Sequence, residues 1–341
     1  MGQTKDFITQ CGELKKYVGP GGHVQIPEEA SWIETQAFEG RDDITSIVFP
    51  GTFGWIESHA FASCKGLQKV VFQKGVTMIS PGAFDGCESL ESVELPDTIT
   101  TIGEHAFRGC RKLKNIMIPE GITSIGETAF FGCEQMADEN GFVIVRDRLY
   151  SYHGNASDVI IPEGVVRIEQ CAFYENKDMV SVRIPDSTEI IGVRAFYGCS
   201  GLKELVIPDL VERIWHGAFA DCSGLQHVQL SESLAELGHG VFAGCENLEA
   251  ICIPENVSYI GSLVFDGCQK LQSIVSPSLP VSAHSNEADK MRAAIGFLDN
   301  PQYSWNPAIA ESYKQFILSH RAIFRHLYPG KRRLETMLES R

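Results

Sequence analysis

Eleven cysteines offer the most obvious chemistry in this sequence of 341 residues. Eight of them fall into two groups, with a step of 23 residues inside each group: Cys64, Cys87, Cys110 and Cys133, then Cys199, Cys222, Cys245 and Cys268. Thiols can form disulfides, ligate zinc or fill a core as small apolar groups. The sequence holds no CxxC pair and no Cys/His cluster at metal-ligand spacing, so we expect no zinc site. The regular step instead predicts a ladder of buried, reduced thiols.

The histidines and carboxylates form no constellation that would support catalysis. His59 and His105 share one repeat position but lie two repeats apart, about 10 Å if neighbouring repeats stack at the spacing of sheet strands. Glu91 and Glu94 belong to a solvated strand face and carry no signal of burial. No GxSxG, HExxH, P-loop or GxGxxG motif occurs where a strand leads into a helix. We therefore predict that the protein is not an enzyme and holds neither a metal nor a cofactor.

A repeating sequence pattern predicts the secondary-structure elements on which these residues lie. One phenylalanine returns every 23 residues in two groups: Phe38, Phe61, Phe84, Phe107 and Phe130, then Phe173, Phe196, Phe219, Phe242 and Phe265. A fixed step of this length is typical of a solenoid, in which each unit buries its apolar face against its neighbours. Residues 90–110, LESVELPDTITTIGEHAFRGC, show the pattern well.

The pattern inside each repeat predicts one short strand followed by a coil. Val93 and Leu95 alternate around Glu94, which is the period of a half-buried strand. Pro96 ends that strand because it has no N–H to donate. Gly103 marks a place where the chain bends or approaches the next coil closely. The other inward side chains of this repeat are Ile99, Ile102, Ala106 and Phe107.

The pattern L-x-x-V-x-I-P-x-x-V-x-x-I-G-x-x-A-F-x-G-C, clearest at residues 113–133, 202–222 and 248–268, resembles the BspA-like class of leucine-rich repeats. The resemblance spans roughly residues 20 to 275. With the flanking segments it implies an α+β fold: a leucine-rich-repeat solenoid of short parallel β-strands in ten 23-residue repeats, two β-hairpin inserts and a C-terminal helical cap. The resemblance also implies cell-surface, adhesion or protein-binding roles and brings no catalytic motif. In such repeats the cysteine column holds Asn or Cys facing inward, and two repeats here place Arg41 and Asn176 there.

The array is a tandem duplication with an offset of 135 residues, because residues 6–38 align without gaps on residues 141–173. The leader of each block is predicted to be a β-hairpin that turns near residues 11–13 or 146–148. The first hairpin would cap an open end of the array, and the second would project from it or wedge between its halves. The predicted domains are an N-terminal hairpin cap (1–24), the first five repeats (25–136), a hairpin insertion (137–158), the second five repeats (159–276) and a helical cap (277–341).

After Ser276 the repeat stops and the composition becomes helical. Capping signals predict one helix from Ser285 or Asn286 to Leu298 and a second over residues 308–328. These helices would cover the last coil. The alternative is that they dock a partner.

The net charge of −15 is unevenly distributed. Residues 1–283 hold 20 basic and 38 acidic side chains, whereas the remainder holds 9 and 6. An acidic array disfavours nonspecific binding to nucleic acid or anionic membranes. The first twelve residues are too polar for a signal peptide, and no apolar run of about 18 residues predicts a membrane helix. We expect no nucleic-acid partner, no membrane insertion and a monomer, located at the cell surface or secreted if a signal peptide has been removed, otherwise in the cytoplasm.

The strand surface remains as the candidate site. Several outward positions are apolar where a solvated sheet would tolerate Thr, Lys or Glu, and exposed apolar surface marks interaction sites. The candidate binding residues are Val48, Val71, Glu94, Met117, Arg183, Val206 and Gln229. We predict a noncatalytic scaffold for adhesion or host interaction, with a protein ligand of unknown identity. Two alternatives stay open: an intracellular regulatory adaptor whose helical tail docks a partner, and a carbohydrate-binding module using Trp55, Trp215 and Tyr259, although these aromatics look scattered over turns.

Overall fold

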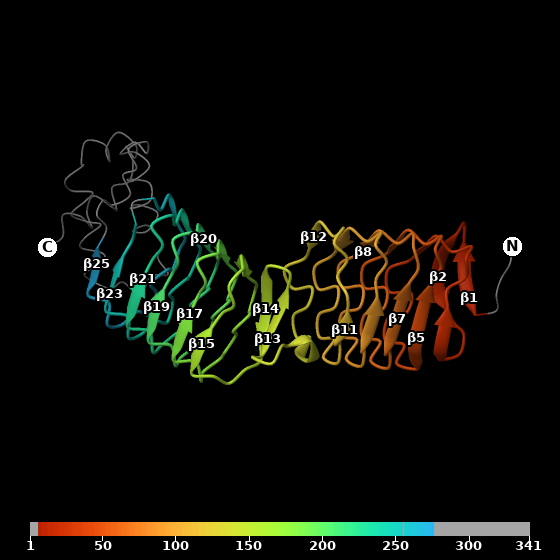
Figure 1. The fold of residues 1–341 in the computed structure, drawn as a ribbon, viewed down its shortest axis with the longest axis horizontal. Coiled ribbons are helices and arrows are strands. Elements are labelled where there is room, and N and C mark those ends of the chain that lie inside the picture. The colour runs from red at the N-terminus through yellow and green to blue at the C-terminus, as the bar shows by residue number, and fades with distance from the viewer. Residues whose placement is uncertain (1–5, 255, 276–341) are drawn as a thin grey trace, which may run out of the picture. The chain divides into compact units, whose positions relative to one another are not determined.

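The computed structural model describes residues 6–254 and 256–275. The chain divides into two compact units, Met1–Gly154 and Asn155–Arg341. Each unit contains a solenoid of short parallel strands (Figure 1). This architecture confirms the predicted leucine-rich-repeat solenoid. The predicted helical cap over residues 277–341 lies outside the described residues.

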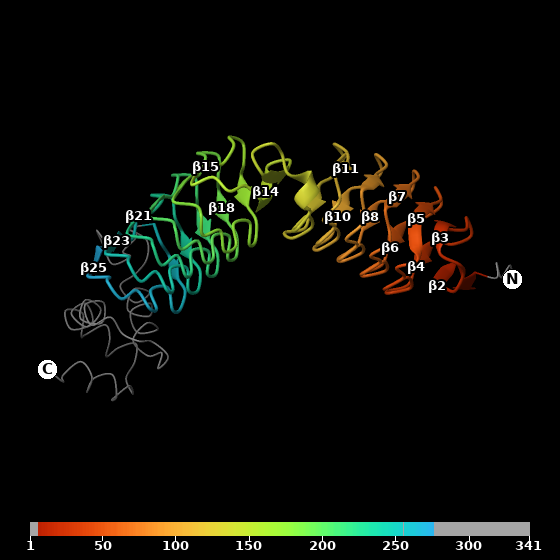
Figure 2. The same cartoon turned by 90° about the horizontal axis from the view of Figure 1, so that it is seen from below.

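In the first unit each repeat makes one coil that contributes a strand to each of two sheets. The longer strands form one sheet: β3 (Gly22–Gln25), β5 (Ile44–Phe49), β7 (Lys69–Phe72), β9 (Ser92–Glu94) and β11 (Asn115–Ile116). The shorter strands follow one another along the other sheet (Figure 2): β4 (Trp32–Ile33), β6 (Trp55–Ile56), β8 (Met78–Ile79), β10 (Thr101–Ile102) and β12 (Ser124–Ile125). Neighbouring coils pair in parallel at the repeat offset, as in Ser46↔Lys69. The pattern predicted the longer strand, and the structure adds the shorter one.

The second unit repeats this arrangement. Its longer strands are β15 (Asp158–Ile160), β17 (Ser181–Arg183), β19 (Glu204–Val206), β21 (His227–Gln229), β23 (Ala250–Cys252) and β25 (Ser273–Val275). Its shorter strands are β16 (Arg167–Ile168), β18 (Ile190–Ile191), β20 (Arg213–Ile214), β22 (Glu236–Leu237) and β24 (Tyr259–Ile260). The pairing is again parallel, as in Val206↔Gln229 and Arg213↔Glu236. The same sequence period therefore builds the same two-sheet coil in both blocks.

Both predicted hairpins are confirmed. The first joins β1 (Phe7–Gln10) to β2 (Glu13–Tyr17), and the second joins β13 (Phe142–Val145) to β14 (Arg148–Tyr152). Strand β2 pairs in parallel with β4. The Tyr17 ring stacks on the Phe38 ring, with the ring centroids 5.2 Å apart. The first hairpin thus closes one end of the first array and extends its aromatic core.

The second hairpin packs on the last coil of the first unit, reached through the 3-10 helix η1 (Glu134–Met136). The Tyr150 hydroxyl donates to the Gly126 carbonyl at 3.2 Å. The Arg146 guanidinium donates to the carbonyl oxygens of Pro119, Glu120 and Ile122 at 2.7–3.0 Å. These bonds tie the second hairpin to backbone carbonyl groups of that coil.

The two hairpins differ where one of them meets a preceding coil. Val143 and Tyr150 are fully buried, while their counterparts by the 135-residue offset are the exposed Ile8 and the half-buried Lys15. Arg146 corresponds to Cys11, which is exposed. The hairpin that packs against a coil carries apolar side chains on that face, and the hairpin at the free end carries lysine there.

The repeated phenylalanines stack along the axis of each unit. Phe61, Phe84 and Phe107 are fully buried, with ring centroids 5.3 and 5.6 Å apart and planes within 7° of parallel. The same stacking holds in the second unit, where Phe196 and Phe219 are 5.0 Å apart. Offset stacking of this kind stabilises a pair by about 0.5–1.5 kcal/mol beyond the area that it buries. The aromatic column is therefore a continuous core and not a set of isolated contacts.

The predicted thiol ladder is confirmed: all eight repeat cysteines are buried and free of disulfides. Each Sγ–H donates to the carbonyl oxygen of the phenylalanine 26 residues earlier, in the preceding coil. The distance is 3.3 Å from Cys110 to Phe84 and 3.2 Å from Cys133 to Phe107. Burial raises the pKa of Cys133 to about 12, so the thiol form that donates this bond is the stable one.

This bond explains why two repeats depart from cysteine. The first repeat of each block follows a hairpin instead of another coil, so no such phenylalanine carbonyl precedes it. Arg41 donates to the hairpin carbonyls of Tyr17 and Gly19 at 3.2 and 2.8 Å. Asn176 accepts the N–H of Met179 at 3.1 Å within its own turn. The longer or more polar side chain reaches a partner that a thiol could not.

The thiol ladder predicts a two-step titration. A thiol reagent applied to the folded protein at neutral pH should label the exposed Cys11 and Cys252 and leave the eight repeat cysteines unreacted. Adding denaturant should expose those eight. Mass spectrometry that found disulfides between consecutive repeats would contradict the ladder.

Gly103 is required by the close approach of two coils and not by its backbone torsion. A Cβ atom at this position would lie 2.6 Å from the Pro81 nitrogen and 2.8 Å from the Ser80 carbonyl carbon. At Gly121 in the next turn, a Cβ atom would meet the Asp97 carbonyl oxygen at an ordinary 3.4 Å. The two glycines thus offer a matched pair for substitution.

We expect Gly103→Ala to destabilise the protein by roughly 1–3 kcal/mol, because the added methyl forces backbone atoms of two coils apart. Gly121→Ala should change stability by less than about 0.5 kcal/mol. The midpoint of urea denaturation, compared for both variants and the parent, checks the difference. Equal midpoints for the two variants would show that the coils can separate at Gly103 without loss.

Candidate binding surface

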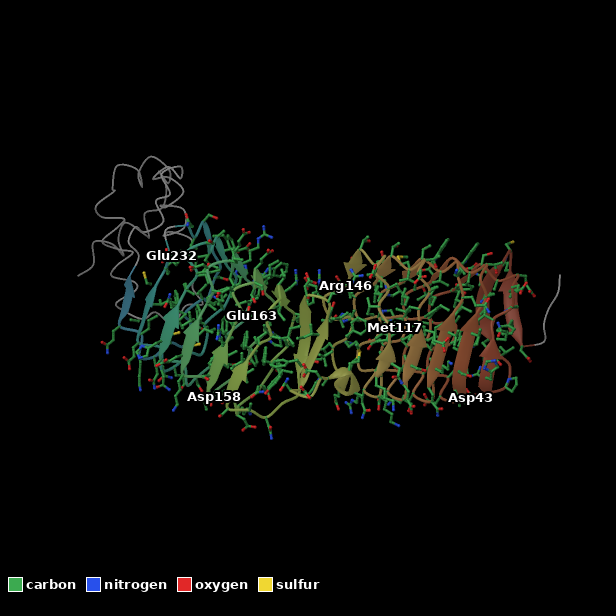
Figure 3. The ribbon with its side chains drawn as sticks, viewed as in Figure 1. Asp43, Met117, Arg146, Asp158, Glu163 and Glu232 are labelled. Carbon is green, nitrogen blue, oxygen red and sulfur yellow. The ribbon has the colours of Figure 1, made fainter. Side chains whose placement is uncertain are left out.

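The predicted binding column of the first unit lies on the outward face of the longer strands. Val48 pairs with Val71, and Val71 with Glu94, in the parallel register of β5, β7 and β9. Met117 follows β11 and is 87% exposed (Figure 3). Val48 and Val71 are only half-exposed, and the Glu94 carboxylate pairs with the Lys69 ammonium at 2.5 Å. In this unit Met117 is the apolar member of the column that is most open to a partner.

The second unit has its own column on the same type of face. Arg183 pairs with Ile160 across β17 and β15, and Val206 with Gln229 across β19 and β21. All four side chains are exposed, with Ile160 at 66% and Val206 at 56%. Exposed apolar and polar residues alternate here from strand to strand. The structure therefore places all seven predicted residues facing outward, without joining them into one apolar stripe.

Sequence reasoning missed an aromatic pair on the shorter strands of the first unit. Trp55 lies on β6 and stacks on Trp32 of β4, with ring centroids 5.9 Å apart and planes 3° from parallel. The register places Met78 of β8 beside Trp55. Trp55 and Met78 are 42% and 37% exposed. The signal was present in the sequence, because the two tryptophans are one repeat step apart.

The interpretation of Trp55 and Tyr259 as turn residues is therefore wrong, since both lie on short strands. Trp215 is half-buried, with the Arg167 guanidinium 5.4 Å from its ring centroid. Tyr259 meets His239 edge-on, and its hydroxyl lies 3.1 Å from His239 Nε2. Trp215 and Tyr259 thus have protein neighbours of their own in the second unit.

Two histidines of the second unit are held by backbone amides of the next coil. His216 Nδ1 accepts the N–H of His239 at 3.0 Å, and His239 Nδ1 accepts the N–H of Ser262 at 2.7 Å. The Ser262 hydroxyl also lies 2.7 Å from His239 Nδ1. A neutral imidazole has one lone pair, so with Nδ1 accepting, the proton sits on Nε2. His239 Nε2 also lies 3.1 Å from the Tyr259 hydroxyl, so both nitrogens of this ring have protein partners.

His59 and His105, the two histidines predicted to be turn residues, both lie in turns. His59 is exposed in a turn at a φ of 57°, and the His105 ring hydrogen-bonds the Thr128 hydroxyl. Among the residues that the structure describes, no group of three or more His, Cys, Asp or Glu side chains could hold a metal ion. In the same part of the chain, no helix has the length and apolar character needed to cross a membrane.

A family model described as BspA type leucine rich repeat region, in six copies, matches residues 22–137 and 143–279. None of the curated proteins matches the chain. The chain is similar to the crystal structure of a leucine rich cell surface protein from Faecalibacterium prausnitzii, with 25% identity and a TM-score of 0.51. That match covers 84% of this chain and 94% of the other.

Two further solved structures show weaker likeness. A leucine-rich repeat protein from Bacteroides ovatus is 27% identical, over 77% of this chain and 82% of that chain, with a TM-score of 0.46. The pneumococcal vaccine antigen PcpA is 23% identical, over 77% of this chain and 74% of that chain, with a TM-score of 0.48.

Proposed function

Because the chain belongs to the BspA-type leucine-rich repeat family, we propose that it is a noncatalytic protein-binding scaffold. The observation that carries the proposal is the exposure of large apolar side chains on the outward face of the longer strands. Met117, Ile160 and Val206 are 87%, 66% and 56% exposed. These positions contribute little to the core, and apolar side chains left in solvent are a feature of interaction surfaces.

The polar members of the same column suit recognition as well. Arg183 stands between Ile160 and the next strand, and Gln229 is paired with Val206. Protein interfaces combine apolar anchors with hydrogen-bonding neighbours at a polar rim. A solenoid presents such positions along an extended surface. Our candidate ligand residues are Val48, Val71, Glu94 and Met117 in the first unit, and Arg183, Val206 and Gln229 in the second.

We further propose a cell-surface location, with adhesion or host interaction as its role. The similarity to a bacterial cell surface protein of the same repeat architecture supports this proposal. Protease treatment of intact cells should digest the protein, whereas a cytoplasmic marker should survive. Protection equal to that of the marker would favour the intracellular adaptor instead.

The ligand face can be tested with substitutions of matched exposure. Val206→Glu and Met117→Glu add charge and remove exposed apolar surface, so proteins captured from a host-cell lysate should be lost. Leu210→Glu is the control, because Leu210 is also 56% exposed but lies in a turn. Thermal midpoints of all three should stay near that of the parent, since exposed substitutions usually change stability by less than about 0.5 kcal/mol. Capture that is unchanged by Val206→Glu and Met117→Glu would place recognition elsewhere.

A further inference from the structure

A second exposed surface lies on the shorter strands of the first unit. We call Trp32, Trp55 and Met78 the tryptophan row. The three residues are consecutive in the register of β4, β6 and β8, and the two indoles stack. Trp32 is half-exposed, and Trp55 and Met78 are exposed. Three large apolar side chains thus form one continuous strip in solvent.

The fold does not require this row, as the second block shows. By the 135-residue offset, the three positions correspond to Arg167, Ile190 and Arg213. Their buried neighbours are unchanged: Ile33, Ile56 and Ile79 correspond to Ile168, Ile191 and Ile214, all with no exposed surface. The same coil is therefore built with or without tryptophan at the outward position. Packing of the coil therefore does not explain the tryptophan row, and a role of the surface does.

The orientation of the indoles limits what can bind them. Stacked on neighbouring strands with nearly parallel planes, the two rings turn their faces toward each other and their edges toward solvent. A sugar ring needs an open aromatic face on which to stack its C–H groups. Ring edges carry positive partial charge and pack well against apolar side chains or against the faces of other aromatic rings. The row therefore suits the side chains of a polypeptide better than a glycan.

Three carboxylates lie near Trp32 and Trp55. Glu13 precedes Trp32 in the register, and its pKa is lowered by hydrogen bonds from Lys15 and then from Trp32. The Trp55 indole N–H donates to Glu57 Oε1 at 2.8 Å. The Lys15 ammonium pairs with Glu13 at 2.7 Å and reaches Glu34 at 3.6 Å. The three carboxylates thus outnumber the one ammonium, and the surroundings of the row are anionic.

From this combination we propose that the tryptophan row docks a segment of another protein that carries apolar side chains next to lysine or arginine. The apolar side chains would pack over the indole edges and Met78, and the cations would meet Glu34 and Glu57. The proposal rests on the scaffold function above, and it assigns that function a second face with its own partner chemistry. Complementary charge would fix the orientation of the segment and accelerate its association.

Two synthetic peptides of about eight residues, one alternating leucine with lysine and one leucine with glutamate, can serve as probes with the full-length protein. Fluorescence anisotropy should show roughly tenfold tighter binding of the leucine–lysine peptide. The charge-neutral double variant Trp55→Ile with Met78→Thr should weaken this binding by a further factor of about ten. The Glu34→Gln/Glu57→Gln variant should weaken it and reduce its salt dependence.

Matched controls distinguish binding to the tryptophan row from nonspecific binding. Tyr174, 45% exposed, belongs to another stacked pair, with Tyr197 at 5.1 Å in the second unit, so Tyr174→Ile should leave binding unchanged. Glu91→Gln with Glu120→Gln, two exposed carboxylates away from the row, should also leave it unchanged. Equal losses in the controls and the row variants would overturn the proposal.

Other occupants of the row would give different results. Light scattering that found a dimer dissociated by Trp55→Ile/Met78→Thr would assign the row to a second copy of the chain. Binding of cellohexaose that this variant abolished would assign it to a glycan. Either result overturns the proposal. Lysate capture that depends on Met117 and Val206 but not on the row would retain the scaffold function and reject this second face.

Discussion

One constraint governs both units: each coil is tied to the next by backbone hydrogen bonds at the turn that carries the repeated phenylalanine. The N–H of Phe84 donates to the carbonyl of Ala106 at 2.8 Å, and that of Phe107 to Ala129 at 2.9 Å. In the second unit Phe196 donates to Ala218 at 2.7 Å. A residue inserted between two such turns would disturb the register of those two turns. The 23-residue step is therefore the spacing that this hydrogen-bond ladder requires.

The other regular columns follow from the same ladder. Coils held this close bring the phenylalanine rings into stacking distance, and they leave no room for a side chain at Gly103. They also bring the Cys110 thiol within 3.3 Å of the Phe84 carbonyl, which becomes its acceptor. Because a buried polar group without a partner costs about 1–3 kcal/mol, a small donor that finds this carbonyl is favoured there. The ring stacking, the close approach of backbones at Gly103 and the thiol ladder thus all depend on the spacing between neighbouring coils.

The sequence was a good guide wherever a residue type recurred because the ladder required it. The phenylalanine and cysteine columns, the longer strands and both hairpins were predicted on that basis. The shorter strands were not, because two residues such as Thr101 and Ile102 are too few to show an alternation. The Trp32–Trp55 and His216–His239 pairs were also missed, although each spans one repeat step of 23 residues, because such pairs occur once and not in every coil. The side on which the second hairpin packs depends on Arg146 reaching carbonyls 24–27 residues earlier, which no local pattern reveals.

The duplication separates what the scaffold needs from what the surface is free to change. Across the 135-residue offset the core is kept, as Phe107 and Phe242 or Cys110 and Cys245 show. Outward positions diverge over the same offset, with Trp55 replaced by Ile190. Since a repeat array is stabilised mainly within each coil and between neighbours, an outward substitution disturbs few contacts. Two blocks with one core can therefore present two surfaces. An exposed tryptophan kept in only one of them is better explained by a partner of that block than by the stability of its fold.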